Sequence, residues 1–230
     1  YRESYLLIIN PETGDVINTI DLSFYAGNSN GIPNMSQMYL HENLLFIAIQ
    51  RLTNSFSITE YSSVIVLDIH TDTIVKEIKL QWTNDLNQVI SPTNPYSKFR
   101  FVSKNIWQPS TPDGNDHLFI NCTGEFGSAY KLDGGIVSID LSDLTVEEGF
   151  IVSEEKIQTE ITDFVITQNG MGYAVTSDEN FHSMLIKFDI SNASILKTIQ
   201  KNTDNLGSLW SLAYHTNSGN LYMCDRTGNN

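Results

Sequence analysis

The chain has 230 residues, of which 40% are hydrophobic, and 13 basic against 27 acidic residues give it a formal net charge of −14. This length and apolar content suffice for a buried core. The acidic balance argues against a nucleic-acid partner and against docking on an anionic membrane, because both need clustered Lys and Arg. It suits a well-solvated surface or a cationic ligand.

No apolar run approaches the roughly 20 residues that a helix needs to span a bilayer. We therefore expect no transmembrane segment. The sequence leaves open whether a signal peptide or a lipid anchor lies outside it.

A strand, a polar turn and a second strand are expected first, at residues 5–22, and this pattern recurs along the chain. Aligned without gaps, its four copies span residues 7–20, 65–78, 137–150 and 186–199. An Asp or Asn ends the first strand of each copy, namely Asn10, Asp68, Asp140 and Asp189. Such side chains accept hydrogen bonds from nearby backbone N–H groups. We therefore interpret these four aligned residues, the turn column, as residues that close the turns and not as catalytic residues.

A further pair of strands precedes each complete copy, with its outgoing strand expected at 43–49, 117–123, 172–177 and 220–226. No segment has a convincing helical period. The chain is therefore expected to be one all-β domain of four-stranded antiparallel units, at 34–80, 104–152 and 161–200, with half units at 1–22 and 206–230. Four-stranded units in series, roughly 45–70 residues apart, predict a β-propeller of three complete blades and two half blades.

The two half units allow two interpretations. They could join into one blade and close a small four-bladed ring, which would remove exposed sheet edges. Alternatively, the chain could be a piece of a larger ring of about seven blades, and this is the interpretation that we favour.

Residues 5–22, YLLIINPETGDVINTIDL, resemble the repeat of surface-layer or YVTN-type β-propellers, in which a strand ends in an Asp/Asn-Pro-x-Thr-Gly turn. The other copies keep neither the Pro nor the Gly. Quinoprotein-like and lactonase-like propellers belong to the same broad group, and residues 94–101 and 124–141 look like those of bacterial extracytoplasmic lipoprotein propellers. The resemblance implies a periplasmic, cell-surface or secreted protein, and it implies no particular activity.

The candidate binding surface is the propeller face at which the loops from second to third strand open around the central channel. We expect these loops at 51–62, 124–135, 177–183 and 225–230, with the connections 23–33 and 81–103 beside them. The candidate ligand-binding residues are the charged and aromatic side chains of these loops: Arg51, Glu60, Tyr61, Glu125, Tyr130, Lys131, Asp178, Glu179, His182, Asp225 and Arg226.

No catalytic, metal-ligating or cofactor-binding set is recognisable, so we expect neither a metal nor a cofactor. The five histidines have no i, i+4 pairing and no metal-ligand spacing. His182 alone lies in a candidate loop, beside Asp178 and Glu179, and is a candidate base or metal ligand. His117 is expected near a turn on the opposite face, where residues 111–117 faintly resemble a calcium loop and fit a plain Asp-Gly turn better.

Trp107 and Trp210 fall in the first strands of their units, so both are expected to pack between blades. The two cysteines, Cys122 and Cys224, lie far apart in strand-like runs. We expect both to be buried free thiols.

The leading hypothesis is a non-enzymatic, extracytoplasmic β-propeller that binds a protein partner or a small polar ligand on its channel-mouth face. One alternative is an enzyme of lactonase or quinoprotein type, with a metal or cofactor in the central channel. The other is a surface-layer-like module that assembles with copies of itself.

Overall fold

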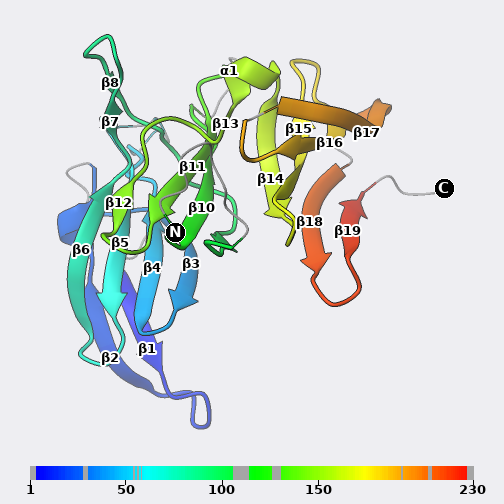
Figure 1. Cartoon of the computed structure of the whole chain (residues 1–230). Coiled ribbons are helices and arrows are strands. Elements are labelled where there is room, and N and C mark those ends of the chain that lie inside the picture. Colours follow the sequence, from blue (N-terminus) through cyan, green and yellow to red (C-terminus); the bar gives the residue numbers. More distant parts are fainter. Residues whose placement is uncertain are drawn as a thin grey trace.

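The chain folds into antiparallel β-sheets that follow one another in the order of the sequence (Figure 1). This computed structural model describes residues 4–27, 31–53, 55, 57, 59–105, 114–125, 131–192, 194–206 and 209–226. Three of its sheets have the expected order, in which each strand pairs with the next along the chain. The prediction of an all-β fold built from four-stranded antiparallel blades is confirmed.

The first and third blades are regular. The first consists of β3 (Met35–His41), β4 (Leu44–Ile49), β5 (Ser63–Asp68) and β6 (Thr73–Lys79). The third consists of β14 (Glu160–Ile166), β15 (Met171–Ser177), β16 (His182–Asp189) and β17 (Ser194–Leu206).

The second blade has an interrupted outer strand. Its inner strands are β9 (Arg100–Val102), β10 (His117–Cys122) and β11 (Gly135–Asp140). Two short strands share the outer edge of β11, namely β12 (Thr145–Val146) and β13 (Val152–Ser153). The first strand therefore begins before residue 104, where we expected the unit to start, and the expected strand around Trp107 falls largely outside the described residues.

Two-stranded sheets stand at the two ends of the series. They pair β1 (Tyr5–Ile9) with β2 (Val16–Asp21), and β18 (Leu209–His215) with β19 (Asn220–Asp225). The connections between sheets hold the remaining elements, namely the 3₁₀ turn Ser23–Tyr25, the hairpin of β7 (Trp82–Thr83) and β8 (Val89–Ile90), and helix α1 (Glu154–Ile157). Within the described ranges, no helix is long and apolar enough to cross a membrane.

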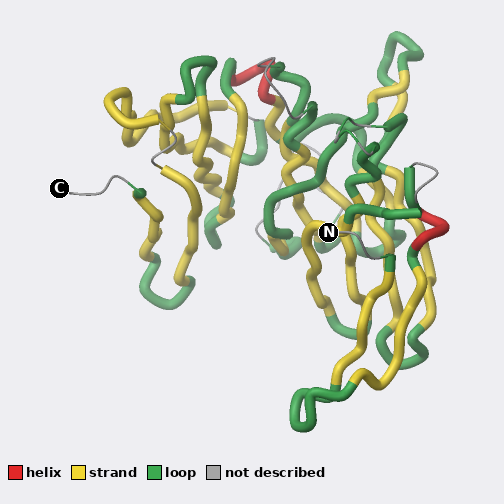
Figure 2. The backbone as a smooth tube through the Cα atoms, turned by 180° about the vertical axis from the view of Figure 1, so that it is seen from behind, coloured by secondary structure: helices red, strands yellow, loops and turns green. Residues whose placement is uncertain are grey.

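The hydrophobic core lies between consecutive sheets, which stand beside one another like the blades of a propeller (Figures 1 and 2). Phe46 belongs to the cluster between the first and second blades, and Phe119 belongs to the cluster between the second and third. Leu212 of β18 packs on the third blade, and Leu22, which follows β2, packs on the first. The alternation of inward and outward residues along each strand thus joins neighbouring blades.

The turn column has the structural role that the repeat predicted. In each copy, the side-chain oxygen of the column residue accepts a hydrogen bond of 2.7–2.9 Å from the backbone N–H two positions on. The four acceptors are Asn10, Asp68, Asp140 and Asp189. These bonds close the turns without glycine at the column position.

The two cysteines differ in exposure. Cys122 is fully buried and free, as expected, whereas Cys224 is exposed, so the expectation of two buried thiols is wrong for Cys224. Cys224 lies on the last strand, β19, whose residues are half-buried or exposed.

Candidate functional site

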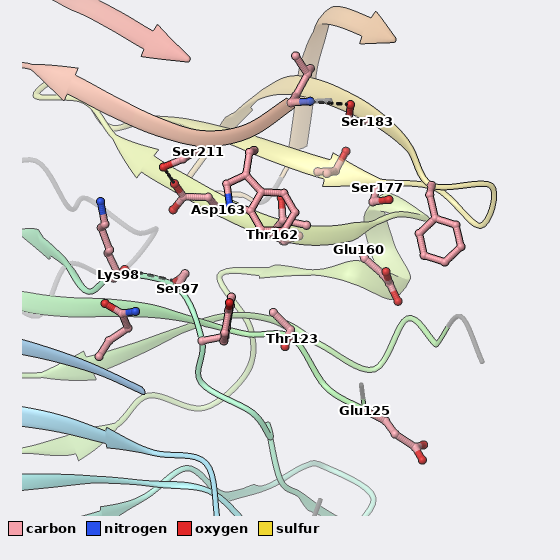
Figure 3. Close-up of a pocket in the computed structure, with 17 residues that line it drawn as sticks. Ser97, Lys98, Thr123, Glu125, Glu160, Thr162, Asp163, Ser177, Ser183 and Ser211 are labelled. Carbon is pink, nitrogen blue, oxygen red and sulfur yellow. Dashed lines mark hydrogen bonds between the residues drawn. The ribbon is translucent and has the colours of Figure 1, made fainter. Parts of the chain in front are cut away.

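A cavity of about 520 Å³ opens between the second and third blades and β18 (Figure 3). Its walls come from β3, from residues 96–98 before β9, from the end of β10, from the first half of β14, from the β15–β16 connection and from the start of β18. The inner strands of several blades therefore meet around it, as they do at the central channel of a propeller.

One wall is a loop that runs along the end of β10. The backbone N–H of Thr123 donates to the carbonyl of Asn94 at 3.1 Å, and the N–H of Tyr96 donates to the carbonyl of Asn121 at 3.1 Å. The Ser97 hydroxyl accepts a 3.0 Å hydrogen bond from the N–H of Asn121. These bonds extend the second blade by a short strand-like piece and fix residues 96–98 at the cavity.

An ion pair holds the inner strands together beside the cavity. The Arg100 guanidinium contacts Asp163 Oδ1 at 3.2 Å and donates through Nε to the carbonyl of Phe164 at 2.7 Å. Asp163 Oδ2 accepts from the Ser211 hydroxyl at 3.0 Å and from the N–H of Leu212 at 2.9 Å. A single buried carboxylate therefore connects β9, β14 and β18.

Two carboxyl groups, Glu160 and Glu154, lie at a second wall or directly behind it. Glu160 lines the cavity, and burial together with the neighbouring Asp133 raises the pKa of its carboxyl group. Behind it, burial raises the pKa of Glu154 to about 8, although Glu154 accepts hydrogen bonds from the N–H groups of Ile161 (2.8 Å) and Gly134 (3.0 Å). Among the described residues, no Lys, Arg or His forms an ion pair with Glu160.

Three aromatic side chains also line the cavity: Tyr96, Phe181 and Trp210. Tyr96 and Trp210 are each 46% exposed, and the guanidinium carbon of Arg226 lies 4.0 Å from the centre of the Trp210 ring. The expectation that Trp210 packs between blades is therefore wrong. The pairing of β18 with β19 shifts register between Leu209 and Ser211, and Leu209 and Leu212 fill the core while Trp210 does not.

Of the candidate loop residues that the structure describes, Glu125 alone also lines the cavity. Its carboxylate forms an ion pair with Lys131, and its backbone N–H donates to Asp133 Oδ1 at 3.1 Å. Tyr130 lies outside the described residues. The connection from β10 to β11 therefore brings two of its three candidate residues together at the rim.

Arg51 and Tyr61 meet each other away from the cavity. The guanidinium carbon of Arg51 lies 4.1 Å from the centre of the Tyr61 ring, and Nη1 of Arg51 lies 3.7 Å from Glu77 Oε1. Glu60 is exposed. This group supports the loop after β4, and none of its members lines the cavity.

Asp178 and His182 form a pair that organises their own turn. Asp178 Oδ1 accepts 2.9 Å hydrogen bonds from the backbone N–H groups of Asn180 and His182, and His182 Nδ1 lies 3.1 Å from Asp178 Oδ2. Burial alone would raise the pKa of Asp178, but these bonds hold it below its usual value. Glu179 is exposed, while Phe181 of the same turn reaches the cavity.

The last candidates, Asp225 and Arg226, lie at the end of β19. Arg226 touches the site through the Trp210 ring. Sequence reasoning missed three side chains of the cavity, which lie in or just before inner strands: Tyr96, Glu160 and Trp210. The sequence feature that could have identified them is their position at the channel end of those strands.

No family model matches the chain, and no curated protein sequence matches it. Among solved structures, it is similar to the Dos1 propeller, with a TM-score of 0.53 and 13% identity over 97% of this chain and 50% of that one. The chain thus spans about half the length of that protein. It also matches the extracellular domains 1–2 of Drosophila Semaphorin 1a (TM-score 0.47, 8% identity, 98% of this chain, 63% of that one).

A third match is the WD40 domain of Neurospora crassa Pan2, with a TM-score of 0.35 and 11% identity over 99% of this chain and 71% of that one. At these identities, the similarity to the Dos1 propeller concerns the fold alone. Together with the series of four-stranded sheets, it identifies the chain as a β-propeller.

Proposed function

We propose that this chain is a binding protein that takes up a small organic cation, such as an amine, in the cavity beside β14 and β18. The observation that carries this proposal is the position of Glu160, a half-buried carboxylate without an ion-pair partner among the described residues, in the same cavity as Tyr96 and Trp210. The extracytoplasmic location implied by the repeat resemblance is part of the proposal.

Charge and aromatic rings act together on such a ligand. A carboxylate attracts an ammonium group more strongly in a partly buried site than in water. The face of an aromatic ring attracts a cation as well, and combined use of rings is how proteins recognise quaternary ammonium groups.

Size and overall charge fit this ligand class. A cavity of about 520 Å³ falls in the range of small-molecule sites, roughly 300–1,000 Å³. The formal net charge of −14 favours the approach of cations over anions. Arg100 pairs with Asp163 and Lys131 pairs with Glu125, so Glu160 is the lining carboxylate that has no ion-pair partner among the described residues.

Calorimetric titration with choline tests the proposal, with glucose as an uncharged ligand of comparable size. We expect saturable binding of choline that weakens as salt is added, and no binding of glucose. Glu160→Gln should weaken choline binding by about tenfold or more, because it removes the charge and keeps the shape.

The matched control is Glu155→Gln, which removes an exposed carboxylate on α1 outside the cavity. It should bind choline as the unchanged chain does. Equal binding of choline and glucose would contradict the proposal, and so would unchanged binding by a folded Glu160→Gln variant.

A further inference from the structure

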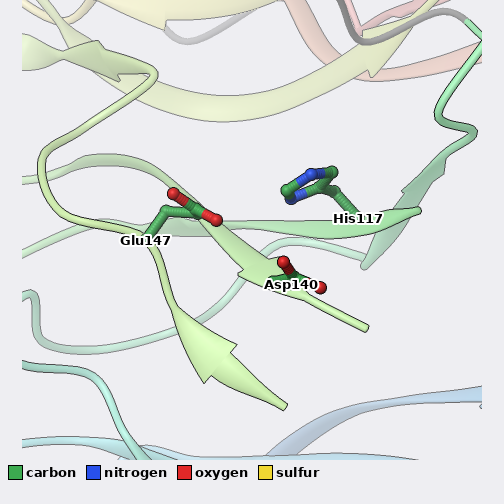
Figure 4. A group of neighbouring side chains, drawn as sticks. All are labelled: His117, Asp140 and Glu147. Atoms are coloured by element: carbon green, nitrogen blue, oxygen red, sulfur yellow. The ribbon is translucent and has the colours of Figure 1, made fainter. Parts of the chain in front are cut away.

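A second cluster of functional side chains lies at the other end of β10, away from the cavity. His117 from β10, Asp140 from β11 and Glu147 after β12 each turn one ligand atom toward the others, and these three atoms lie within 4.8 Å of one another (Figure 4). His117 is fully buried and Asp140 is 6% exposed. The binding cavity lies at the Cys122 end of β10, about 17 Å away by the rise of a strand.

We propose that His117, Asp140 and Glu147 form a binding site for a divalent transition-metal ion, with Zn²⁺ as the best chemical match. One imidazole nitrogen and two carboxylate oxygens suit Zn²⁺, whereas Mg²⁺ and Ca²⁺ prefer oxygen ligands alone. Zn²⁺ binds such atoms at about 2.0–2.2 Å, which places them roughly 3.3 Å apart in a tetrahedral site. The three ligand atoms would therefore have to move closer together when the ion binds.

Hydrogen bonds around the cluster orient its members as such bonds do in metal sites. The Ser138 hydroxyl lies 2.9 Å from His117 Nδ1, so Nε2 is the nitrogen that would coordinate the metal. Asp140 Oδ2 accepts from the side-chain amide of Asn115 at 2.7 Å. Asp140 Oδ1 accepts a second hydrogen bond, of 2.7 Å, from the backbone N–H of Ser142, so the orientation of the carboxylate is fixed from two sides.

The other blades serve as an internal control. Asp140 pairs across the strands with His117, whereas its equivalents Asp68 and Asp189 pair with Leu44 and Met171. All three aspartates close their turns in the same way. The turn therefore does not require a histidine at this position.

The repeat does not require a glutamate at the position of Glu147 either. In the aligned copies it corresponds to Val75 and Leu196, which are 50% and 51% exposed. The outer strand of the second blade is also interrupted between Val146 and Val152, so Glu147 is the first residue beyond β12, whereas β6 and β17 run on past the equivalent position. Within the described parts of the chain, the second blade alone places three potential ligands side by side.

Titration of the chelator-treated, metal-free chain with Zn²⁺ tests the site. We expect the chain to bind one equivalent of Zn²⁺ tightly. The unfolding temperature should rise, because an ion that binds only the folded state stabilises that state. Co²⁺ in place of Zn²⁺ should give the visible absorption of a low-coordinate N/O site, and Ca²⁺ should not compete. The readout does not depend on the proposed amine ligand.

Two neighbouring glutamates provide a matched pair of variants. Glu147→Gln should weaken Zn²⁺ binding by about tenfold or more, while Glu148→Gln, which changes the exposed carboxylate next to it, should leave binding unchanged. Ser138→Ala removes the partner of the imidazole and should cost about tenfold. Because Glu147 and Ser138 are changed without touching His117, the test does not depend on a buried histidine variant folding.

A surface histidine could also bind Zn²⁺, so His182→Ala is included to remove the Asp178–His182 pair. Zn²⁺ binding that persists in His182→Ala and falls in Glu147→Gln supports the proposal. Binding that is lost in His182→Ala, that is equal in Glu147→Gln and Glu148→Gln, or that is absent in the unchanged chain would overturn it.

Discussion

The second strands of the first two blades, β4 and β10, have the same length and the same place in the fold, but they carry different side chains at their ends. Phe46 and Phe119 occupy the same position in the middle, and both are fully buried. The first residue is Leu44 in β4 and His117 in β10, so the middle of the strand is alike and its end is not.

The fifth residue shows the same divergence. Ala48 of β4 is buried among apolar side chains, whereas Asn121 of β10 donates a 2.7 Å hydrogen bond to the carbonyl of Ile161 on β14. Packing between blades constrains the middle of a strand, because each blade buries both of its faces there. The strand ends are where the second blade departs from the first and gathers polar groups.

The largest effects should fall on the shared feature. Phe46→Ala and Phe119→Ala should each lower the free energy of unfolding by about 3–5 kcal/mol, since each deletes a fully buried ring between two blades. Denaturant unfolding followed by circular dichroism measures both. A loss below about 1 kcal/mol in one variant alone would mean that the two blades are not equivalent in their cores.

The residue opposite each phenylalanine sharpens the comparison. Tyr39 lies opposite Phe46, while Arg100 lies opposite Phe119 and pairs with Asp163. Arg100→Met should destabilise the chain by about 3 kcal/mol, because it leaves the Asp163 carboxylate buried without its cation. Tyr39→Phe, the control in the first blade, should cost less than about 1 kcal/mol, and equal losses in the two variants would contradict this account.

Glu154, which follows β13, should make stability depend on pH. Its pKa in the folded chain is about 8 against an ordinary 4.5, so the folded state holds a proton that the unfolded state releases. The stability it contributes is complete below about pH 4.5 and is lost as the pH rises toward 8, at up to about 1.4 kcal/mol per unit.

Glu154→Gln cannot titrate, so the difference in unfolding free energy between variant and unchanged chain should shift steadily in favour of the variant from pH 5 to pH 8. Thermal unfolding at several pH values in one ionic strength measures this difference. A difference that is constant with pH would show that Glu154 is already ionised in the folded chain.

The smallest effect concerns the turns. Asp68→Ala should cost about 1 kcal/mol, the value of one partly exposed hydrogen bond to the N–H of His70. Asp140→Ala should cost more, because Asp140 is buried and also accepts from Asn115. Unfolding of the metal-free variants compares them, and equal losses would remove the distinction between the two blades at this position.

The repeat predicted the fold well because it depends on local patterns. Alternation gives the strands, and the side chains of Asp68 and its equivalents close the turns with the N–H two positions on. The first strand of the second blade was misplaced because β9 has three residues and follows a long connection, so its pattern is too short to recognise.

The two sites were harder to predict because their residues meet only in three dimensions. Tyr96 reaches the cavity through hydrogen bonds to the end of β10, and Trp210 is turned toward it by a register shift in β18. His117 and Asp140 become neighbours through the pairing of β10 with β11, and no sequence motif reports that register.

The difference in exposure between the two cysteines makes thiol labelling a measure of how often the second blade opens locally. Burial and the nearby Glu154 raise the pKa of the Cys122 thiol, so Cys122 should react with a thiol reagent only when the second blade opens at its cavity end. Cys224 is exposed and should react at once. The rate of the slow labelling phase would therefore report how often the inner end of that blade separates from its neighbours, and a ligand in the cavity should slow it.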